Sequence, residues 1–409
     1  MGDLIQLECQ EIAHRGLGVG RCNGMVVFLF GAAPGELVSA RVTKISRRHA
    51  FADTVEVHRG SQHRVLPPCP YFGRCGGCQL QHLNYPFQLT TKRLVLERAL
   101  AGAGVESQVE TELVGSMDPW RYRWRGEFHR SREGPPLGFK SRGSYQVLGI
   151  ADCLIHHPTV ALSLAAVGEA VQGQGPRVQT VQLTVGEGGR QLLLQTRPDD
   201  SASGPTAIAA AARLPPQANL TDESTSLNFR GRDFRVFPDS FIQVNQGTVG
   251  ALYSTVEEFL AGQLEGAHIV DGYAGAGILS LRMADLGAQV TAIESSPVAA
   301  RLCQLHAEMY APGRVETVCG QVEDELARAR PAGAVVLDPP RAGLAPKVRS
   351  WLATDGPRSV VYLSCEVSAL ARDLAGLCGK GPYRLERLCL VDMFPQTYHF
   401  ETVALLRRR

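Results

Sequence analysis

The chain carries a cysteine at the end of an apolar segment, and its thiol is a candidate nucleophile. Residues 360–365 (Val-Val-Tyr-Leu-Ser-Cys) join strand-forming residues to a Ser-Cys pair, and Glu366 onward predicts the start of a helix. In an open α/β sheet such a strand delivers its last residues to the carboxyl edge, where ligands bind. A free cysteine is commonly a buried core residue, so Cys365 by itself leaves both interpretations open.

Two further segments are expected to bring carboxylates to the same edge. Residues 334–337 (Ala-Val-Val-Leu) predict a second buried strand, which ends in Asp338-Pro-Pro-Arg341. Glu401 precedes a third segment of this kind. A thiol, two carboxylates and an arginine are thereby expected at neighbouring positions of one sheet. This convergence of three segments favours a catalytic role for Cys365 over a core role.

The order and spacing of these segments resemble the uracil-5 RNA methyltransferase family. The resemblance rests on Asp-Pro-Pro-Arg-Ala-Gly-Leu at 338–344, Ser-Cys at 364–365, Leu-Ala-Arg-Asp-Leu at 370–374, Phe-Pro at 394–395 and Glu-Thr-Val-Ala at 401–404. The family usually has Asn-Pro after the cysteine, whereas Glu366-Val367 follow here. The resemblance implies that Cys365 adds to C6 of uracil and that Glu401 removes the C5 proton.

A glycine-rich turn predicts a cofactor site. Residues 268–277 (His-Ile-Val-Asp-Gly-Tyr-Ala-Gly-Ala-Gly) predict a strand, a turn and a helix start, and Glu294 ends the next strand, placed for ribose hydroxyls. This pattern fits NAD or S-adenosylmethionine. Ser280 stands where the dinucleotide pattern has its third glycine, and with the Asp-Pro-Pro-Arg segment this favours S-adenosylmethionine. The family resemblance implies that the cofactor is held by Gln243, Tyr273, Glu294 and Asp338.

Three closely spaced cysteines give the strongest local metal signal. Cys69, Cys75 and Cys78 have the spacing C-x₅-C-x₂-C with glycines between them, which suits zinc or an iron–sulfur cluster. Soft thiolates do not choose between these metals. The family resemblance implies a [4Fe-4S] cluster whose fourth ligand is Cys153. Unligated thiols are the alternative, for Cys153 in particular.

The first 60 residues predict an RNA-binding barrel. Short apolar runs separated by glycine-rich turns indicate four or five strands, and the segment resembles a TRAM domain, an OB-like module. A basic tract with a nearby aromatic residue suits single-stranded RNA, the alternative being a solvated strand face. This tract consists of Arg41, Lys44, Arg47 and Arg48, with Phe51 close by.

A second basic tract lies between residues 119 and 142, with seven Lys or Arg against two acidic residues. Arginines alternate with aromatic residues from Trp120 to Arg132, which predicts a strand with one packed face and one face toward phosphate. Arg121 and Arg123 are therefore expected to contact RNA. A solvated strand is again the alternative.

Length and composition set the remaining limits. A chain of 409 residues is expected to hold two or three domains. The net charge of +2 gives no overall basic bias, so any RNA surface must be local. We expect neither a membrane span nor a signal peptide, and eleven cysteines favour metal ligands and catalytic thiols over disulfides. The predicted location is cytoplasmic, with RNA as partner and no obligate protein partner inferred.

The sequence thus predicts an α/β protein of three domains. Residues 1–60 form the TRAM or OB-like barrel, residues 61–235 an α+β central domain with the iron–sulfur cluster, and residues 236–409 a Rossmann-like methyltransferase domain. The expected activity is S-adenosylmethionine-dependent C5 methylation of uridine, and the barrel and cluster resemble the 23S rRNA branch. The alternatives are a tRNA uridine-5 methyltransferase, a cytosine-5 RNA methyltransferase and a non-catalytic iron–sulfur RNA-binding protein.

Overall fold

The computed structural model describes residues 2–105, 109–174, 178–197, 204–214, 216, 218–329 and 333–409. The chain forms two compact units, each built from separate segments. The first unit comprises Met1–Val95, Asp118–Glu223 and Phe394–His399, and the second comprises Leu96–Met117, Ser224–Met393 and Phe400–Arg409. None of the described helices is long and apolar enough to cross a membrane.

The N-terminal part of the first unit is a six-stranded sheet in the order β1-β5-β6-β4-β3-β2. Only β4 and β6 pair in parallel; the other neighbours are antiparallel. Alternating small and branched side chains such as Val27, Leu29 and Val38 build its core. The strands are β1 (Leu4–Glu8), β2 (Glu11–Ile12), β3 (Gly18–Cys22), β4 (Met25–Phe30), β5 (Leu37–Ile45) and β6 (His49–Arg59).

A second sheet of the first unit has the order β10-β9-β8-β11-β12-β13. Helices α2 and α3 pack against it, with Val160, Leu164 and Val167 of α2 fully buried. The elements are β8 (Arg125–Arg130), β9 (Leu137–Lys140), β10 (Val147–Gly149), α2 (Pro158–Gly173), β11 (Thr180–Val185), β12 (Gln191–Arg197), α3 (Gly204–Ala211) and β13 (Asn219–Thr221).

A short segment from far along the chain completes the first unit. The carbonyl of Gln396 accepts hydrogen bonds from the backbone N–H groups of Gln79 (3.1 Å) and Leu80 (3.0 Å). The side-chain amide of Gln396 accepts a further bond (3.0 Å) from Gln88, which lies on α1 (Tyr85–Gly102). Leu80, Gln88 and Gln396 are all buried, so residues 394–399 are an integral part of this unit.

The second unit is organised around an eight-stranded sheet in the order β18-β17-β16-β19-β20-β22-β21-β7. The five strands from β18 to β20 are parallel, and β22 is inserted antiparallel beside β20. A hairpin of β14 (Thr225–Phe229) and β15 (Arg232–Val236) precedes it. The strands are β7 (Thr111–Val114), β16 (His268–Gly272), β17 (Gln289–Glu294), β18 (Val315–Cys319), β19 (Ala334–Leu337), β20 (Ser359–Ser364), β21 (Tyr383–Val391) and β22 (Glu401–Arg408).

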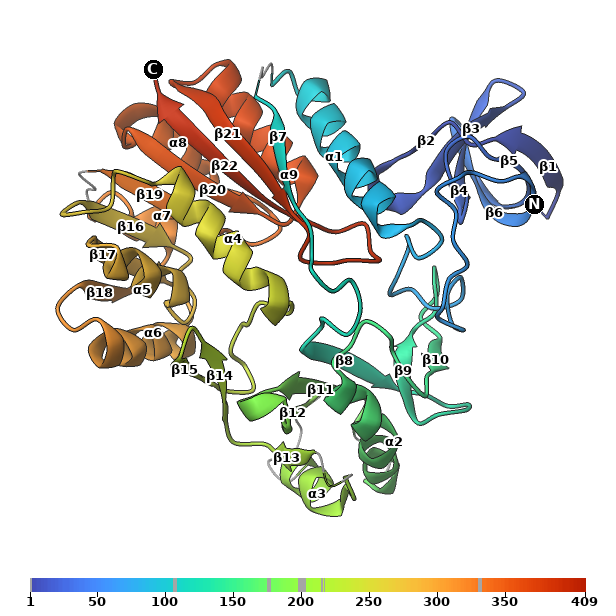
Figure 1. The fold of residues 1–409 in the computed structure, drawn as a ribbon, viewed down its shortest axis with the longest axis horizontal. Coiled ribbons are helices and arrows are strands. Elements are labelled where there is room, and N and C mark those ends of the chain that lie inside the picture. Colours follow the sequence, from blue (N-terminus) through green and yellow to red (C-terminus); the bar gives the residue numbers. More distant parts are fainter. Residues whose placement is uncertain are drawn as a thin grey trace. The chain divides into compact units, whose positions relative to one another are not determined.

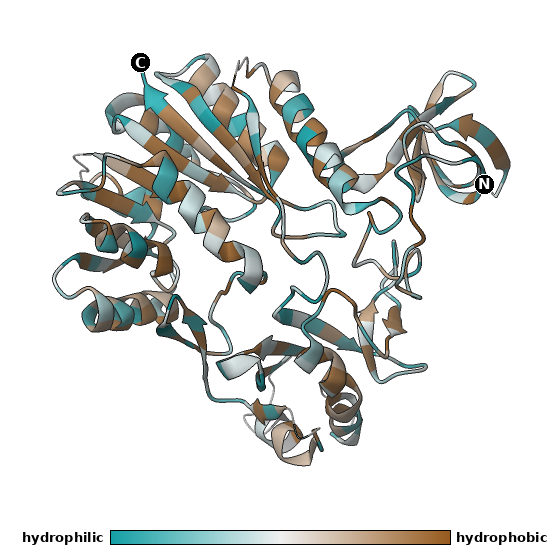
Figure 2. Cartoon of the chain, viewed as in Figure 1, coloured by the Kyte–Doolittle hydropathy of each residue, from teal (hydrophilic) through white to brown (hydrophobic). Residues whose placement is uncertain are grey.

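Helices cover both faces of this sheet (Figure 1). Residues of α1, α7, α8 and α9 share one core with alternate strand residues such as Val335, Val360 and Leu406. Helices α4, α5 and α6 pack against strands on the other face. The inner strands are buried on both faces and are strongly hydrophobic along their length, as Figure 2 shows. The helices are α4 (Gln246–Phe259), α5 (Ile278–Asp285), α6 (Pro297–Tyr310), α7 (Val322–Glu325), α8 (Pro346–Asp355) and α9 (Val367–Leu374).

The strand directions decide where the chemistry can lie. The parallel strands β16, β17, β19 and β20 end at one edge of the sheet, and antiparallel β22 begins there, with Thr402 paired to Ser364. The backbone N–H of Asp338 donates to the carbonyl of Gly272 (3.3 Å), so the segments after β16 and β19 are adjacent. This edge therefore gathers the residues after four strands and the first residue of a fifth.

Candidate active site

Cys365 lies at the carboxyl end of β20, directly before α9. Every residue of β20 is buried, and the Ser364 carbonyl accepts a hydrogen bond (2.9 Å) from the hydroxyl of Thr402 on β22. Cys365 itself is only half-buried. The strand is therefore fixed on both sides while its terminal thiol keeps access to the sheet edge.

Glu366 acts as the N-cap of α9. Its carboxylate accepts hydrogen bonds from the backbone N–H (3.5 Å) and the hydroxyl (2.7 Å) of Ser368. A carboxylate at this position satisfies a donor that the first helical turn leaves free and suits the helix dipole. The Glu366-Val367 pair thus has a local structural reason: it starts the helix immediately after Cys365.

Cys365, Asp338, Glu401 and Arg341 form one electrostatic group. Burial raises the pKa of the Cys365 thiol to about 11, and the charges of Glu401 and Asp338 add to the shift, whereas Arg341 opposes it. Burial and the charge of Asp338 raise the pKa of Glu401 well above its usual range, again opposed by Arg341. Burial raises the pKa of Asp338 to about 6. The structure therefore brings together the four residues that the three segments predicted.

Asp373 ties these segments to one another, and the sequence patterns assigned it no role. Its fully buried carboxylate accepts hydrogen bonds from the Tyr362 hydroxyl (2.9 Å) on β20 and the Leu344 backbone N–H (2.9 Å) in the loop after β19. The guanidinium groups of Arg372 (2.9 Å) and Arg349 (3.1 Å) also donate to it. An aspartate at an apolar-face position of an amphipathic helix is the signal that could have identified it.

The turn after β16 is preformed in an unusual backbone conformation. Tyr273, Gly275 and Gly277 all have positive φ (67°, 57° and 81°), which strains the tyrosine but not the glycines. A Cβ on Gly277 would lie 2.5 Å from the Cys303 sulfur, so only glycine fits there. The carboxylate of Glu294 accepts the Gly275 backbone N–H at 2.9 Å. The predicted acid is therefore fixed against the predicted glycine turn.

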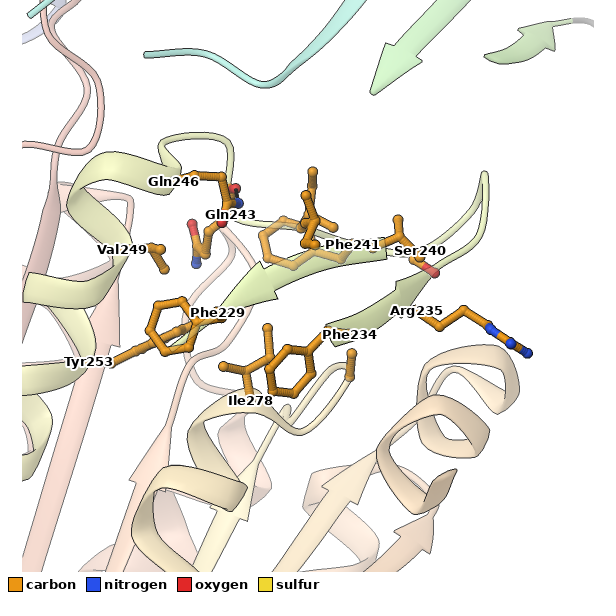
Figure 3. A pocket seen from close by; sticks show the side chains of 14 residues that line it. Phe229, Phe234, Arg235, Ser240, Phe241, Gln243, Gln246, Val249, Tyr253 and Ile278 are labelled. Atoms are coloured by element: carbon orange, nitrogen blue, oxygen red, sulfur yellow. Dashed lines mark hydrogen bonds between the residues drawn. The ribbon is translucent and has the colours of Figure 1, made fainter. Parts of the chain in front are cut away.

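Gln243 lines a cavity of about 30 Å³ between the β14–β15 hairpin, the start of α4 and the glycine turn (Figure 3). Its backbone carbonyl accepts a hydrogen bond (2.5 Å) from the side chain of Gln246. Figure 3 shows the two glutamines on one side of the cavity and the rings of Phe229 and Phe234 on the other. Ala276 of the glycine turn also lines it, so Gln243 and the turn border one space.

A larger cavity, of about 410 Å³, lies at the ends of β16, β18 and β19. It is lined by Tyr273, by Gln321 after β18 and by the loop 342–346. Burial raises the pKa of the Tyr273 hydroxyl to about 12, so this group stays protonated near neutral pH and can donate a hydrogen bond. The sheet edge thus offers room for a ligand beside the turn and the Asp-Pro-Pro-Arg loop.

The four predicted metal-binding cysteines lie together in the first unit. Burial raises the pKa of Cys78, and the charges of Cys153, Cys75 and Cys69 raise it further. Burial raises the pKa of Cys153 to about 12, with smaller contributions from Cys75 and Cys69. The Gly77 backbone N–H donates to the Cys75 sulfur (3.4 Å). Within the described ranges, no three His, Cys, Asp or Glu side chains are placed as ligands of one metal ion.

The basic tract of the N-terminal sheet is exposed and borders an aromatic group. Arg47 and Arg48 occupy the turn between β5 and β6. Beside this turn, Phe28 stacks on Phe51 with centroids 5.3 Å apart, and His49 meets both rings edge-on. Cationic side chains beside half-exposed aromatic rings are the combination expected from the sequence to bind single-stranded nucleic acid.

The second basic tract differs from its prediction. The expected strand from Trp120 to Arg132 is formed only from Arg125 to Arg130, and Arg121 has a φ of 53°, which excludes it from a strand. Arg121 does not present a free cation: both its Nη atoms donate to Asp152 (2.7 and 2.6 Å), and one also donates to the carbonyl of Cys153 (3.1 Å). Arg121 therefore braces the loop that carries Cys153.

Comparisons with known proteins bear on the family of the chain. Residues 323–409 match the family model described as tRNA (Uracil-5-)-methyltransferase, and residues 5–55 match the TRAM domain. The chain is 32% identical to 23S rRNA (uracil(1939)-C(5))-methyltransferase RlmD of Shewanella amazonensis, over 98% of this chain and 95% of that protein. It is 34% identical to the protein of the same name from Dichelobacter nodosus, over 97% of each.

A solved structure shares the fold. The crystal structure of Pyrococcus abyssi tRNA (uracil-54, C5)-methyltransferase in complex with S-adenosyl-L-homocysteine matches with a TM-score of 0.76. The match covers 98% of this chain and 100% of that chain at 23% identity. The N-terminal TRAM domain and the α/β methyltransferase fold predicted from the sequence are confirmed by these matches.

Proposed function

The chain belongs to the RNA uracil-5 methyltransferase family, and we propose that it methylates C5 of a uridine in 23S rRNA with S-adenosylmethionine as donor. The observation that carries the proposal is the position of the Cys365 thiol beside Glu401 and Asp338 at one sheet edge. Two of the most similar relatives bear the name of 23S rRNA enzymes over nearly their full length, which supports rRNA as the substrate.

The chemistry follows from the low reactivity of C5. Addition of the Cys365 sulfur to C6 of the ring converts C4, C5 and O4 into an enolate, which makes C5 nucleophilic. A bound donor would supply the methyl group to C5, and its sulfur would keep the electron pair of the sulfur–methyl bond that breaks. The ionised carboxylate of Glu401 then removes the C5 proton. The electron pair of the broken C–H bond forms the C5–C6 double bond and expels the sulfur from C6. Each role requires one group in the correct protonation state at the sheet edge.

The pKa values constrain this sequence. With a pKa of about 11, only roughly one Cys365 thiol in ten thousand is ionised at pH 7, so attack must accompany loss of the proton. Arg341 opposes the upward pKa shifts of both Cys365 and Glu401. We assign Arg341 the role of limiting the upward pKa shifts of the nucleophile and the base.

The donor site is assigned to Gln243, Tyr273, Glu294 and Asp338. Glycines without side chains let a ligand approach the backbone after β16, and Glu294 is held where ribose hydroxyls are bound in open α/β sheets. The cavity of about 410 Å³ beside Tyr273 gives the ligand room on this edge, and Gln243 borders only the small cavity beside the glycine turn. When bound, the donor supplies an electrophilic methyl group and one positive charge.

We further propose a [4Fe-4S] cluster on Cys69, Cys75, Cys78 and Cys153. Two observations support this proposal: the four thiols lie close enough to influence one another electrostatically, and a backbone N–H donates to one sulfur. Ligation would require the sulfurs to move closer together, because they are not placed as ligands of one ion in the described residues. All eleven cysteines are free thiols. The cluster would hold the loop of residues 69–78 to that of Cys153.

The remaining assignments concern the parts of the chain. We propose that residues 1–60 act as the TRAM module, residues 61–235 as a central domain and residues 236–409 as the catalytic domain, and that the protein works in the cytoplasm. The exposed arginines between β5 and β6 would contact the RNA backbone. A tRNA substrate is the second candidate, favoured by the match of residues 323–409 to the tRNA (Uracil-5-)-methyltransferase family.

The decisive experiment supplies purified full-length protein with methyl-labelled S-adenosylmethionine and transcripts of 23S rRNA or tRNA. Nuclease digestion and mass spectrometry should find 5-methyluridine in the rRNA transcript and none with Cys365→Ala. Labelling of tRNA alone would assign the substrate to the second candidate. Binding of S-adenosylmethionine without methylation of any RNA would support the non-catalytic alternative.

A further inference from the structure

A cavity of about 390 Å³ lies in the first unit between strand β6 and the loop that carries the three clustered cysteines. Residues 54–57 of β6 line it on one side, and Phe72, His82 and Arg142 line it on the other. The volume is within the range of small-ligand sites. None of the residues assigned to catalysis, the donor or the cluster belongs to it.

Thr54 and His82, two residues that line this cavity, each have one buried side-chain atom that lacks a hydrogen-bond partner among the described residues. These atoms are the hydroxyl oxygen of Thr54 and Nδ1 of His82. The second ring nitrogen of His82, Nε2, lies 3.2 Å from the Ala32 carbonyl, and because a carbonyl only accepts, Nε2 must carry the proton. Nδ1 of the neutral ring is then a bare acceptor. A buried acceptor without a donor costs about 1–3 kcal/mol, so the cavity favours a ligand that supplies one.

The protonation state of His82 supports this hydrogen-bond pattern. Burial lowers the pKa of His82 to about 4, and the positive charge of Arg64 lowers it further. The imidazole is therefore neutral at physiological pH, and Nδ1 presents a lone pair. Arg64 is committed elsewhere, because it donates to both carboxylate oxygens of Glu36 and to the Gly31 carbonyl.

Part of the remaining wall is aromatic, beside the charged side chains of Asp53, Glu56 and Arg64. The Phe72 ring lies 5.6 Å from that of Phe30 and 5.9 Å from that of His82, measured between centroids. The guanidinium of Arg142 lies 4.0 Å from the centre of the Phe30 ring and donates to Asp53 (2.6 Å). Aromatic rings and guanidinium planes are the surfaces on which unstacked bases of single-stranded RNA are held.

β6 also presents an unpaired edge at this place. Strand β4 pairs with β6 only from His49 to Asp53, whereas β6 continues to Arg59. In the described part of the chain, no strand occupies the β4 side of residues 54–57. Backbone N–H and C=O groups along such an edge offer alternate donors and acceptors, as the edge of a base requires.

From these observations we infer that the cavity receives one unstacked nucleobase of the RNA, with a donor of the base on His82 Nδ1 and an acceptor of the base on the Thr54 hydroxyl. The inference rests on the proposed function for its RNA ligand. The pocket would act as a second base-binding site, separate from the catalytic site that receives the uridine to be methylated.

Two variants each delete a single hydrogen-bonding group of the cavity and leave the fold in place. His82→Gln retains an amide donor at the position of Nε2 but deletes the Nδ1 acceptor, and Thr54→Val deletes only the hydroxyl. Thr90→Val is the matched control, because its hydroxyl bonds within α1 to the Pro86 carbonyl and lies outside the cavity. Urea unfolding midpoints establish that all three variants fold.

The measurement is fluorescence anisotropy of the full chain with single-stranded RNA octamers of adenosine, cytidine or uridine at several salt concentrations. Both cavity variants should weaken binding of the octamer that binds best, roughly tenfold, because each removes one hydrogen bond to a base. The salt slope should not change, because neither substitution removes a cation that neutralises a phosphate. The Thr90 variant should bind like wild type.

Three outcomes would overturn the inference. If both cavity variants bind every octamer with wild-type affinity, the cavity holds ordered water and receives no base. Equal weakening of all octamers with a reduced salt slope would mean that the cavity binds phosphate. Loss of mononucleotide binding alone, with octamer binding unchanged, would assign the cavity to a free nucleotide. Methylation by the wild type is measured in parallel: its failure contradicts the proposed function, whereas its success with unaffected variants contradicts only the pocket.

Discussion

The hydroxyl of Tyr362 donates a 2.9 Å hydrogen bond to the carboxylate of Asp373. Tyr362 lies on β20, three residues before the nucleophile Cys365. Because Asp373 also accepts the Leu344 N–H, one carboxylate connects the strand of the nucleophile with the loop of Asp338 and Arg341. A Cβ on Gly343 would lie 2.5 Å from this carboxylate, which shows how closely the loop is held. Asp373 is therefore a positioning residue for the site.

Replacing Asp373 by Asn should lower both stability and activity. Loss of the buried charge weakens the hydrogen bonds from Tyr362, Leu344 and two partly exposed arginines and should cost about 1.5–3 kcal/mol of unfolding free energy. Tyr362→Phe removes one hydrogen bond and should cost about 1 kcal/mol. Urea unfolding gives both values, and the rate of covalent capture of 5-fluorouridine RNA per folded molecule reports positioning. Wild-type capture by folded Asp373→Asn protein would contradict the role.

Cys365 and Glu401 should fail at different steps. Cys365→Ala should abolish methylation and every covalent RNA complex, because no adduct at C6 can form. Glu401→Gln should still form the adduct and transfer the methyl group, but the C5 proton stays in place, so methylated RNA remains attached to Cys365. Denaturing electrophoresis detects that complex. Normal turnover by Glu401→Gln would move the base role to another carboxylate, with Asp338 and Glu366 the next candidates.

Arg341 should set the pH dependence of the reaction. Its positive charge lowers the pKa values of Cys365 and Glu401, so Arg341→Gln raises both and moves the rise of the rate–pH profile to higher pH. Arg341→Lys keeps the charge and should restore most of the wild-type profile. Methylation rates between pH 6 and pH 9 test this. Superimposable profiles for Arg341→Gln and wild type would show that the arginine does not act on these groups.

The cysteine cluster makes a compositional prediction. Protein purified without oxygen should be brown and contain about four irons per chain. Cys153→Ser should lose iron and folded yield together, whereas Cys22→Ser in β3 should retain both. Iron and sulfide analysis provides the measurement. Stoichiometric zinc without iron or sulfide would replace the cluster by a single-ion site.

The two basic tracts should respond differently to mutation. Replacing Arg47 and Arg48 by Gln should weaken RNA binding and reduce the salt slope by about 0.7 for each phosphate that is no longer neutralised. Arg121→Gln should leave the salt slope unchanged and loosen the loop of Cys153, because its donors are bound to Asp152 and the Cys153 carbonyl. Binding titrations over a salt series test both statements. A reduced slope for Arg121→Gln would show that Arg121 binds RNA after all.

The sequence was sufficient to place Asp338, Cys365 and Glu401, because buried parallel strands are continuous apolar runs whose ends are visible as polar residues. It was insufficient for Arg121, whose side chain pairs with Asp152, a residue 31 positions away. The His82–Thr54 cavity was missed for the same reason, whereas Asp373 left a signal in its helix pattern. A buried polar atom has meaning only once its neighbours in space are known.

The alternation of the chain between its two units has a consequence for biosynthesis. Gln396 supplies a backbone acceptor and a side-chain partner to residues 79–88, so the first unit contains an element that a ribosome adds about 300 residues later. The first unit therefore cannot complete its native hydrogen bonding until residue 396 has been synthesised. Fragments that stop before residue 394 should expose the unpaired amides of Gln79 and Leu80, which would make them targets for chaperones or proteases.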